Sequence, residues 1–184
     1  DFGDAVELHF GSMAPGGYAW MFPKANGANI GVGIQNKFSK GKKLNDLTND
    51  FVSRYGNEIT FTGAGSLPMS GTIGTFVKEN YVLVGDSAGM VLPSNGAGIT
   101  IAMIGGRIAG QVISEHLKSG ISLAEYEFRW DKQMGRVMRN SKRAFSFGSY
   151  ILRLPDWIIN LIFNRFTKPF VWRSITCRNM FFIF

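Results

Sequence analysis

The sequence is poor in the residues that build disulfide frameworks and most metal centres. Its 184 residues include one cysteine, Cys177, and two histidines, His9 and His116, that lie far apart. A single cysteine excludes a disulfide scaffold, a zinc ribbon and a cysteine-ligated iron–sulfur cluster formed within this chain. The two histidines lack the spacing of a metalloprotease zinc site. We therefore predict no metal site.

Long apolar runs are also missing, as is a basic-then-apolar leader at the start. The apolar blocks are shorter than the ~20 uninterrupted residues that a membrane-spanning helix needs. The sequence begins without methionine, at DFGDAVELHFG, in the middle of a strand-like pattern, which indicates a piece of something longer. With 45% hydrophobic and 18% charged residues, the composition predicts one globular domain or two small ones.

Acidic residues are scarce near the C-terminal end. Residues 129–184 contain 11 Lys/Arg and 2 Asp/Glu, whereas residues 1–128 contain 9 and 11. The basic residues alternate with apolar blocks such as YILRLPDWIINLIF, a pattern that favours helices lying on an anionic membrane surface. One alternative is a helical subdomain with a solvated basic face. Nucleic-acid binding is the other, but it usually shows polar, Gly- or Ser-interleaved charge, so we predict no nucleic-acid partner.

The first 77 residues have the pattern of strands and turns. Alternation in VELHF, YAWMF and ANIGVGI predicts an antiparallel sheet, with a turn at Asn26–Gly27. The segment LNDLTNDFVSRYG predicts one amphipathic helix that stops at Gly56. The Gly-, Ser- and Pro-rich segment FTGAGSLPMSGTIG predicts a loop.

The following residues, 78–120, predict a strand, a glycine-rich loop and a helix. The apolar run YVLVGD predicts a buried parallel strand that ends at Asp86. A helix is expected from Ile99 to Leu117. It carries a stripe of very small residues that indicates a closely packed neighbour, a transmembrane helix contact being the weaker interpretation. The stripe consists of Ala102, Gly106 and Gly110.

Residues 121–184 are expected to be mostly helical. The segment AEYEFRWDKQMGRVMRNSKRAF predicts one charged helix. Another is expected to begin at Leu154–Pro155–Asp156, with the Asp156 carboxylate near the positive end of the helix.

The glycine-rich loop suits a polyhydroxylated, electron-accepting cofactor. Asp86 would lie at the carboxyl end of its strand, where ligands bind in open α/β sheets. Its carboxylate could hold a sugar-like hydroxyl, and the helix that starts near Gly98 would present free N–H groups and a partial positive charge. The alternative is that Asp86 only caps the helix.

The loop also resembles a known motif. The pattern Gly-Asp-x-Ala-Gly-x-x-x-Pro-x-x-Gly-x-Gly-Ile, which includes Ala88 and Gly89, resembles the second FAD motif of the flavoprotein monooxygenase and reductase superfamily. The resemblance implies FAD as the cofactor, with Asp86 at the ribityl chain and the later glycines at the isoalloxazine ring. The cofactor-binding residues that it implies are Gly85, Asp86, Pro93, Gly96, Gly98 and Ile99.

A second motif resembles the signature of geranylgeranyl reductases, and its APGGYAW context resembles the archaeal-type digeranylgeranylglycerophospholipid reductases. In GGYAWMFPKANGANIGVG, a Tyr-x-Trp-x-Phe-Pro element is followed after seven residues by Gly-x-Gly. The resemblance implies an isoprenoid-binding pocket. A strand would place the three aromatic rings on one face, where they form an apolar wall; an aromatic core strand is the alternative. The predicted substrate-binding residues are Tyr18, Trp20, Phe22, Pro23, Gly31 and Gly33.

Together these resemblances imply an α+β and α/β fold, the C-terminal part of a p-hydroxybenzoate-hydroxylase-like FAD fold. The expected parts are an antiparallel substrate-binding sheet in residues 1–77, the FAD-binding strand–loop–helix in residues 78–120, and a helical, membrane-associating region in residues 121–184. The Rossmann N-terminal half is expected to be missing, because no Gly-x-Gly here continues as G-x-G-x-x-G between a strand and a helix. The small-residue stripe would pack against that missing sheet.

The function that the resemblance implies is FAD-dependent reduction of C=C bonds in the geranylgeranyl chains of isoprenoid membrane lipids. The enzyme would be peripheral, at the cytoplasmic face of the membrane, and the chain alone would be incomplete. The electron donor, whether reduced ferredoxin, a nicotinamide or another, stays open, and Tyr18 is only a candidate proton donor. The alternatives are another FAD-dependent monooxygenase or quinone-linked oxidoreductase of the superfamily, and a non-catalytic membrane-associated fragment.

Overall fold

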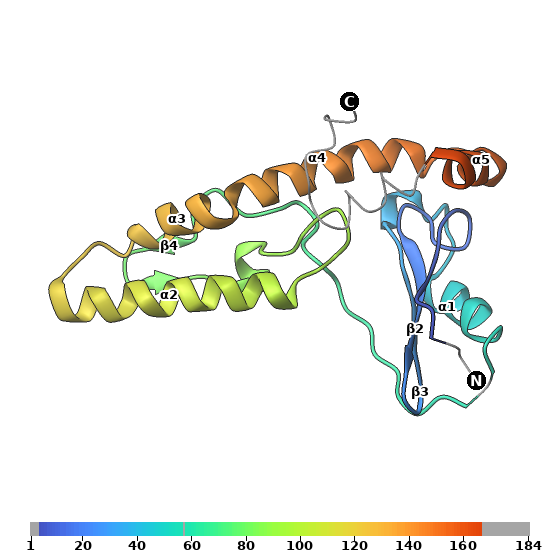
Figure 1. Cartoon of the computed structure of the whole chain (residues 1–184), viewed down its shortest axis with the longest axis horizontal. Helices are drawn as coiled ribbons and strands as arrows, with labels where there is room; N and C mark the ends of the chain where they lie inside the picture. The colour runs from blue at the N-terminus through green and yellow to red at the C-terminus, as the bar shows by residue number, and fades with distance from the viewer. Residues whose placement is uncertain (1–3, 57, 167–184) are drawn as a thin grey trace. The chain divides into compact units, whose positions relative to one another are not determined.

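The computed structural model describes residues 4–56 and 58–166. The chain divides into two compact units, Asp1–Ala64 with Gly148–Thr167, and Gly65–Phe147 with Lys168–Phe184. We call them the sheet unit and the helical unit, and describe each by itself (Figure 1).

The sheet unit contains the predicted antiparallel sheet. Its strands β1 (Glu7–His9), β2 (Tyr18–Lys24) and β3 (Gly27–Gly33) lie in the order β1-β2-β3. Lys24 pairs with Gly27, so the turn between β2 and β3 is Ala25–Asn26, one residue earlier than predicted. The backbone φ of Gly27 is +131°, a conformation that residues with a Cβ rarely adopt.

One face of this sheet is covered by α1 (Leu44–Val52), which confirms the predicted amphipathic helix. Leu47 and Phe51 of α1 form a buried cluster with small apolar residues of the sheet and its loops, Ala14, Ala19 and Val32. The short helix η1 (Asn36–Phe38) precedes α1. The apolar stripe of α1 therefore defines which face of β2 and β3 is the core.

A polar cluster ties β1 to the end of α1. The Tyr55 hydroxyl donates a hydrogen bond to the Glu7 carboxylate at 2.6 Å, and His9 Nε2 lies 2.9 Å from the same carboxylate oxygen. The Tyr55 hydrogen bond, followed by that of His9, lowers the pKa of Glu7. Burial, aided by Glu7, raises the pKa of Tyr55 to about 12. The cluster stabilises the edge of the sheet.

The helix α5 (Asp156–Phe166) begins at the predicted residue and belongs to the sheet unit. Ser12 donates two hydrogen bonds to the Asp156 carboxylate, from its backbone N–H at 3.0 Å and from its hydroxyl at 2.7 Å. Ile159 is buried, whereas Trp157 and Leu161 are exposed. Asp156 therefore fixes the start of α5 to the loop after β1.

The helical unit is built on α2 (Ile99–Ser119) and α3 (Glu125–Trp130), and α3 continues into the π-helical turn η3 (Asp131–Gly135) and α4 (Arg136–Ile151). The residues of α4 from Gly148 onward belong to the sheet unit. The long charged helix predicted from the sequence is confirmed, with a π-helical turn inside it. The core between these elements consists mainly of Phe76, Met90, Leu92, Ile101, Ile108, Val112, Tyr126, Trp130, Met134 and Met138. The predicted loop before Phe76 contains no helix or strand.

The predicted buried parallel strand over residues 81–86 is wrong. The structure has a short antiparallel pair instead, β4 (Val77–Lys78) and β5 (Tyr81–Val82). The Tyr81 side chain is 74% exposed, while Val82 and Val84 pack against the helical core. Among the described residues only one face of β5 packs against the helical core, so its side chains alternate between core and solvent instead of being buried on both faces.

Within the described residues, the two glycines of the small-residue stripe of α2 have no close neighbour. A Cβ at Gly110 would meet no atom within 4 Å, and one at Gly106 would lie 3.9 Å from Val84. The packed glycine is Gly105, where a Cβ would lie 2.6 Å from the Met90 sulfur. The neighbour predicted for the stripe is a sheet in the part of the relatives that this chain does not span, so that prediction stays untested, and the close contact at Gly105 is an additional one.

Candidate functional site

The aromatic motif forms a row on one face of β2. Tyr18, Trp20 and Phe22 alternate with the buried Ala19 and Met21, and neighbouring ring centroids lie 5.8 and 6.2 Å apart. Phe22 is 37% exposed, and the other two rings are half-buried. The core face of this strand is therefore the face of Ala19 and Met21, and the aromatic row faces away from α1.

The Gly-x-Gly element lies directly opposite this row on β3. Gly33 pairs with Tyr18 and Gly31 pairs with Trp20, so both glycines lie on the aromatic face. A Cβ at Gly31 would overlap the Trp20 indole, which lies over this glycine. The indole N–H donates a hydrogen bond to the Asn29 side-chain oxygen at 2.7 Å. The two halves of the motif thus make one surface, in which glycine leaves room for the ring.

Two features of this surface were missed from the sequence. Asn29, which orients Trp20, was not selected, although it lies opposite Phe22 once the hairpin register is known. Leu8 of β1 pairs with Trp20 and extends the apolar surface. The signal that could have found Asn29 is the two-residue turn between β2 and β3, because loop length sets which residues face each other. That turn does not set the register of β1, so it gives no signal for Leu8. Pro23 lies on the other face of β2, opposite Ala28.

Burial raises the pKa of Tyr18. A tyrosine whose pKa lies above its ordinary value of 10.0 keeps its proton throughout the neutral range. The Tyr18 hydroxyl is therefore a proton-carrying group on a surface whose other polar groups include the Asn29 amide and the Trp20 indole N–H that bonds to it.

In the helical unit, the residues of the glycine-rich loop come together at the start of α2. A Cβ at Gly98 would lie 3.7 Å from Asp86 Oδ1 and 3.3 Å from Val91. Asp86 is exposed, and the structure shows no hydrogen bond to its carboxylate from any described residue. Asp86 therefore does not cap α2, whose first turn has no side-chain cap.

The N-terminus of α2 is open. Gly98 is the residue before the helix, and Ile99 at its start is 83% exposed. The uncapped N–H groups carry the partial positive charge of a 21-residue helix. An exposed carboxylate, an open helix end and a glycine between them fit a polyhydroxylated, electron-accepting group such as FAD.

Other residues of the same motif hold the loop together. Gly85 and Gly89 have φ of +69° and +67°, and a Cβ at Gly89 would collide with the backbone carbonyl of Gly71. Pro93 is fully buried, and Gly96 has φ of +75° with Leu67 beside it. The motif therefore contains residues that the fold requires as well as residues that face solvent.

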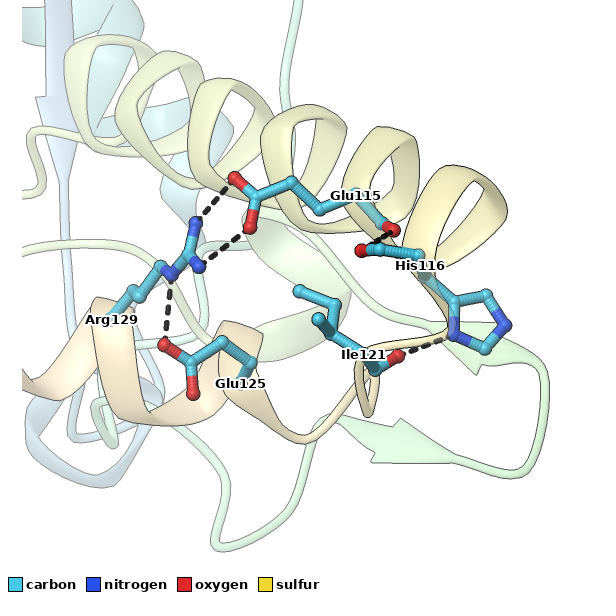
Figure 2. Close-up of polar contacts among 6 residues, drawn as sticks. Glu115, His116, Ile121, Glu125 and Arg129 are labelled. Carbon is cyan, nitrogen blue, oxygen red and sulfur yellow. Dashed lines mark hydrogen bonds and ion pairs between the residues drawn. The ribbon is translucent and has the colours of Figure 1, made fainter.

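A separate polar cluster holds the hairpin between α2 and α3 (Figure 2). Arg129 donates hydrogen bonds to both Glu115 carboxylate oxygens, at 2.9 and 2.7 Å, and to Glu125 at 2.9 Å. The Arg129 hydrogen bonds lower the pKa of Glu115, and those carboxylates raise the pKa of Arg129. His116 Nδ1 lies 2.6 Å from the Ile121 carbonyl. All these groups are used in joining two helices, so we assign the cluster a structural role.

The described residues contain no group of three or more His, Cys, Asp or Glu that could hold a metal ion. Among them, no helix is both long and apolar enough to cross a membrane. The residues after Phe166, including Cys177 and much of the predicted membrane-associating region, lie outside the described residues.

Comparison with known proteins covers both parts of the candidate site. Residues 3–64, which include the aromatic row and its glycines, match the family model described as geranylgeranyl reductase catalytic domain. A digeranylgeranylglycerophospholipid reductase from Methanosphaera stadtmanae is 38% identical over 89% of this chain. One from Methanothermobacter thermautotrophicus is 36% identical over 83%.

By these matches the chain is similar to members of the geranylgeranyl reductase family. It spans less than half of the length of these relatives, 44% and 40% of the two reductases. A solved geranylgeranyl bacteriochlorophyll reductase-like protein from Thermoplasma acidophilum is 26% identical, with a TM-score of 0.69, over 85% of this chain and 42% of that one. The mixed α/β architecture is therefore that of part of a geranylgeranyl reductase-like fold.

Proposed function

We propose that this chain is part of an FAD-dependent reductase that saturates C=C bonds in the geranylgeranyl chains of isoprenoid membrane lipids. The observation that carries the proposal is the aromatic row of β2, which faces away from the core with glycines opposite it. A polyprenyl chain is long and apolar, and such a surface gives it a continuous hydrophobic contact. The names of the relatives, digeranylgeranylglycerophospholipid reductases, support this substrate class.

We assign residues 1–77 to substrate binding, residues 78–120 to FAD and residues 121–184 to membrane association at the cytoplasmic face. A bound, reduced flavin would supply the hydride for the alkene. In this assignment the Asp86 carboxylate accepts a hydrogen bond from a cofactor hydroxyl. The start of α2 stabilises negative charge, and Gly98 lets the backbone approach a flat ring.

Saturation of an isolated alkene also needs a proton on the second carbon. Tyr18 carries a hydroxyl on the aromatic face of β2, and this hydroxyl is protonated near neutral pH, as in any tyrosine. Because burial raises its pKa and so makes it a weaker acid, the proposal rests on its position. We propose Tyr18 as the acid, the alternative being a group in the part of the relatives that this chain does not span.

The substitution Tyr18→Phe tests the proposed proton donor. It is made in a full-length protein that contains this chain and is as long as the relatives. The change keeps the ring and removes the hydroxyl, so flavin content should hold while turnover falls by ~10²–10⁴, the usual contribution of a general acid. Rapid-quench measurement of single turnover, with the flavin pre-reduced, isolates this step. Turnover at the unsubstituted rate would place the acid elsewhere.

Two substitutions in the same full-length protein, Trp20→Ala and Asp86→Asn, test whether the aromatic motif binds substrate and the glycine-rich motif binds flavin. Trp20→Ala should keep bound flavin and lose turnover on geranylgeranyl lipid. Asp86→Asn should weaken flavin binding about tenfold or more, because a hydrogen bond to a charged group contributes ~1.5–3 kcal/mol. Flavin absorbance after desalting and an anaerobic reductase assay measure the two effects.

Phe128→Ala, which truncates an exposed aromatic residue of α3, is the matched control and should change neither. If flavin is lost with Trp20→Ala, Trp20 belongs to the structural core. If Asp86→Asn retains flavin fully, Asp86 has no part in cofactor binding.

A further inference from the structure

The sheet unit carries a concentration of positive charge that the overall charge count hides. Residues 37–43, KFSKGKK, contain four exposed lysines, and we call this segment the lysine loop. It turns sharply at Lys40 and Gly41, whose φ values are +50° and +83°. Within the described residues none of the four lysines forms an ion pair with a carboxylate. The lysines are Lys37, Lys40, Lys42 and Lys43.

Contacts within the sheet unit bring the lysine loop to the end of α4 and the start of α5. The Arg153 guanidinium lies 4.9 Å from the Phe38 ring centroid and 4.9 Å from that of Tyr150. Lys42 Nζ donates a hydrogen bond to the Ser12 carbonyl at 3.4 Å, and Ser12 in turn holds the Asp156 carboxylate. Segments more than 100 positions apart in the sequence thus form one basic surface.

Large apolar side chains are exposed beside these cations. Trp157 is 69% exposed and Leu161, one turn later on α5, is 55% exposed. Tyr150 is 66% exposed, and the Arg153 guanidinium lies over its ring. Ile159 is buried, so α5 has a defined inner side and presents the tryptophan outward. Surfaces that enter the boundary between lipid headgroups and acyl chains typically combine tryptophan and tyrosine with lysine and arginine.

We propose that this surface docks the protein on an anionic bilayer. The lysine loop and Arg153 contact headgroup phosphates, and Trp157, Leu161 and Tyr150 insert between lipids. Its charge complements anionic lipid, whereas a nucleic-acid surface would not need an exposed tryptophan and leucine side by side. The inference deepens the proposed function, on which it rests for the reason to visit a membrane: the substrate is a membrane lipid.

Co-sedimentation of the full chain with vesicles tests the inference. The vesicles are phosphatidylcholine alone, or phosphatidylcholine with phosphatidylglycerol, all with saturated chains so that no reducible bond is present. The test variant replaces the four lysines of the lysine loop with glutamine. The matched control removes the same net charge outside the lysine loop and outside residues 121–184, by glutamine at four other exposed basic residues, Lys24, Lys78, Arg107 and Lys118.

The lysine-loop variant should bind anionic vesicles at least tenfold more weakly, since each lysine near such a surface contributes about fivefold in affinity. The control variant should lose much less. Raising the salt from about 0.1 M to about 1 M shortens the screening length from ~10 Å to ~3 Å, and should weaken the unsubstituted chain without abolishing binding. Trp157→Ala with Leu161→Ala should remove the binding that survives high salt.

Equal losses in the lysine-loop and control variants would overturn the inference, because net charge alone would then explain binding. Equal binding to neutral and anionic vesicles would overturn it as well. A double α5 variant that melts at a lower temperature but binds unchanged would show that these residues pack against protein. None of these readouts involves turnover, so failure here leaves the reductase proposal standing, and the Trp20 and Asp86 tests can fail without affecting the docking result.

Discussion

At the residue scale, two glycines of α2 lie in very different packing environments. Gly105 faces the fully buried Met90, whose sulfur also accepts hydrogen bonds from the Gly85 N–H and the Tyr126 hydroxyl. Gly110, five positions later on the same helix, faces open space. Because two hydrogen-bond donors and close packing hold this sulfur in place, moving it to make room for a Cβ at Gly105 costs free energy. The same substitution on one helix should therefore have opposite effects at these two positions.

We expect Gly105→Ala to lower the free energy of unfolding by about 1–3 kcal/mol, the usual cost of overpacking a core. Gly110→Ala in the same 184-residue chain should raise it by up to ~1 kcal/mol, because alanine is the better helix former and meets no neighbour. Urea denaturation followed by circular dichroism measures both. Similar destabilisation by the two substitutions would contradict this account of α2.

The sequence predicted the face of β2 correctly but did not predict the close contact at Gly105 of α2, and the reason is physical. Strand alternation has a period of two, so Tyr18, Trp20 and Phe22 can share a face only with one another. On α2, apolar and small residues occur on several sides, and a stripe of small residues does not reveal whether its neighbour belongs to the described part of the chain. Distinguishing Gly105 from Gly106 needs the position of Met90, which is set by tertiary packing.

At the scale of elements, the hairpin between α2 and α3 depends on one arginine. Arg129 joins Glu115 of α2 to Glu125 of its own helix (Figure 2). Because the Arg129 hydrogen bonds hold the pKa of Glu115 below 4.5, the ionised carboxylate contributes stability above that pH. The contribution is lost as the pH falls through the lowered pKa.

Arg129→Met should therefore lower the melting temperature near neutral pH and flatten its dependence on pH in the acid range. The unsubstituted chain should lose more stability between about pH 5 and about pH 3 than the variant does. Arg139→Met is the control. It breaks an ion pair with Asp131 in which both side chains are more than half exposed, and such pairs contribute little. Parallel pH profiles for the unsubstituted chain and Arg129→Met would contradict the assignment.

Elements were predictable where local pattern and tertiary surroundings agree. The helices α1 and α5 begin close to the predicted residues because an apolar stripe or an acidic first residue marks them. The segment that contains β5 was predicted as a buried parallel strand because YVLVGD is continuously apolar. An apolar run does not determine which strands pair with it, and the structure pairs β5 with β4 in antiparallel orientation. The π-helical turn η3 has no signal in the sequence that we used, since its residues are ordinary helix formers apart from Gly135.

At the scale of the whole molecule, the two units are joined in part by an exposed stretch without helix or strand. Residues 58–67 are all exposed, and Phe61 within them is 85% exposed. Such stretches are where proteases cut first, because cleavage needs a segment that can leave the fold.

Limited digestion of the 184-residue chain with chymotrypsin should therefore cut first after Phe61 and leave fragments of about one third and two thirds of its length. Phe51, which is 1% exposed in α1, should resist until the sheet unit unfolds. Mass spectrometry of the early products identifies the site. Early cleavage inside α1 or α2 would show that the units are less stable than their cores indicate.

The backbone contact between Gly71 and Gly89 bears on how residues of the glycine-rich motif vary among relatives. Two stretches of main chain touch there without side chains between them, and Ile73 N–H donates to the Ala88 carbonyl beside the contact. Under the proposed function, a relative that no longer binds flavin would still need glycine at position 89 to fold. Its fold would place no such demand on Asp86, which is exposed. Among such relatives the glycine should therefore be kept while the aspartate varies.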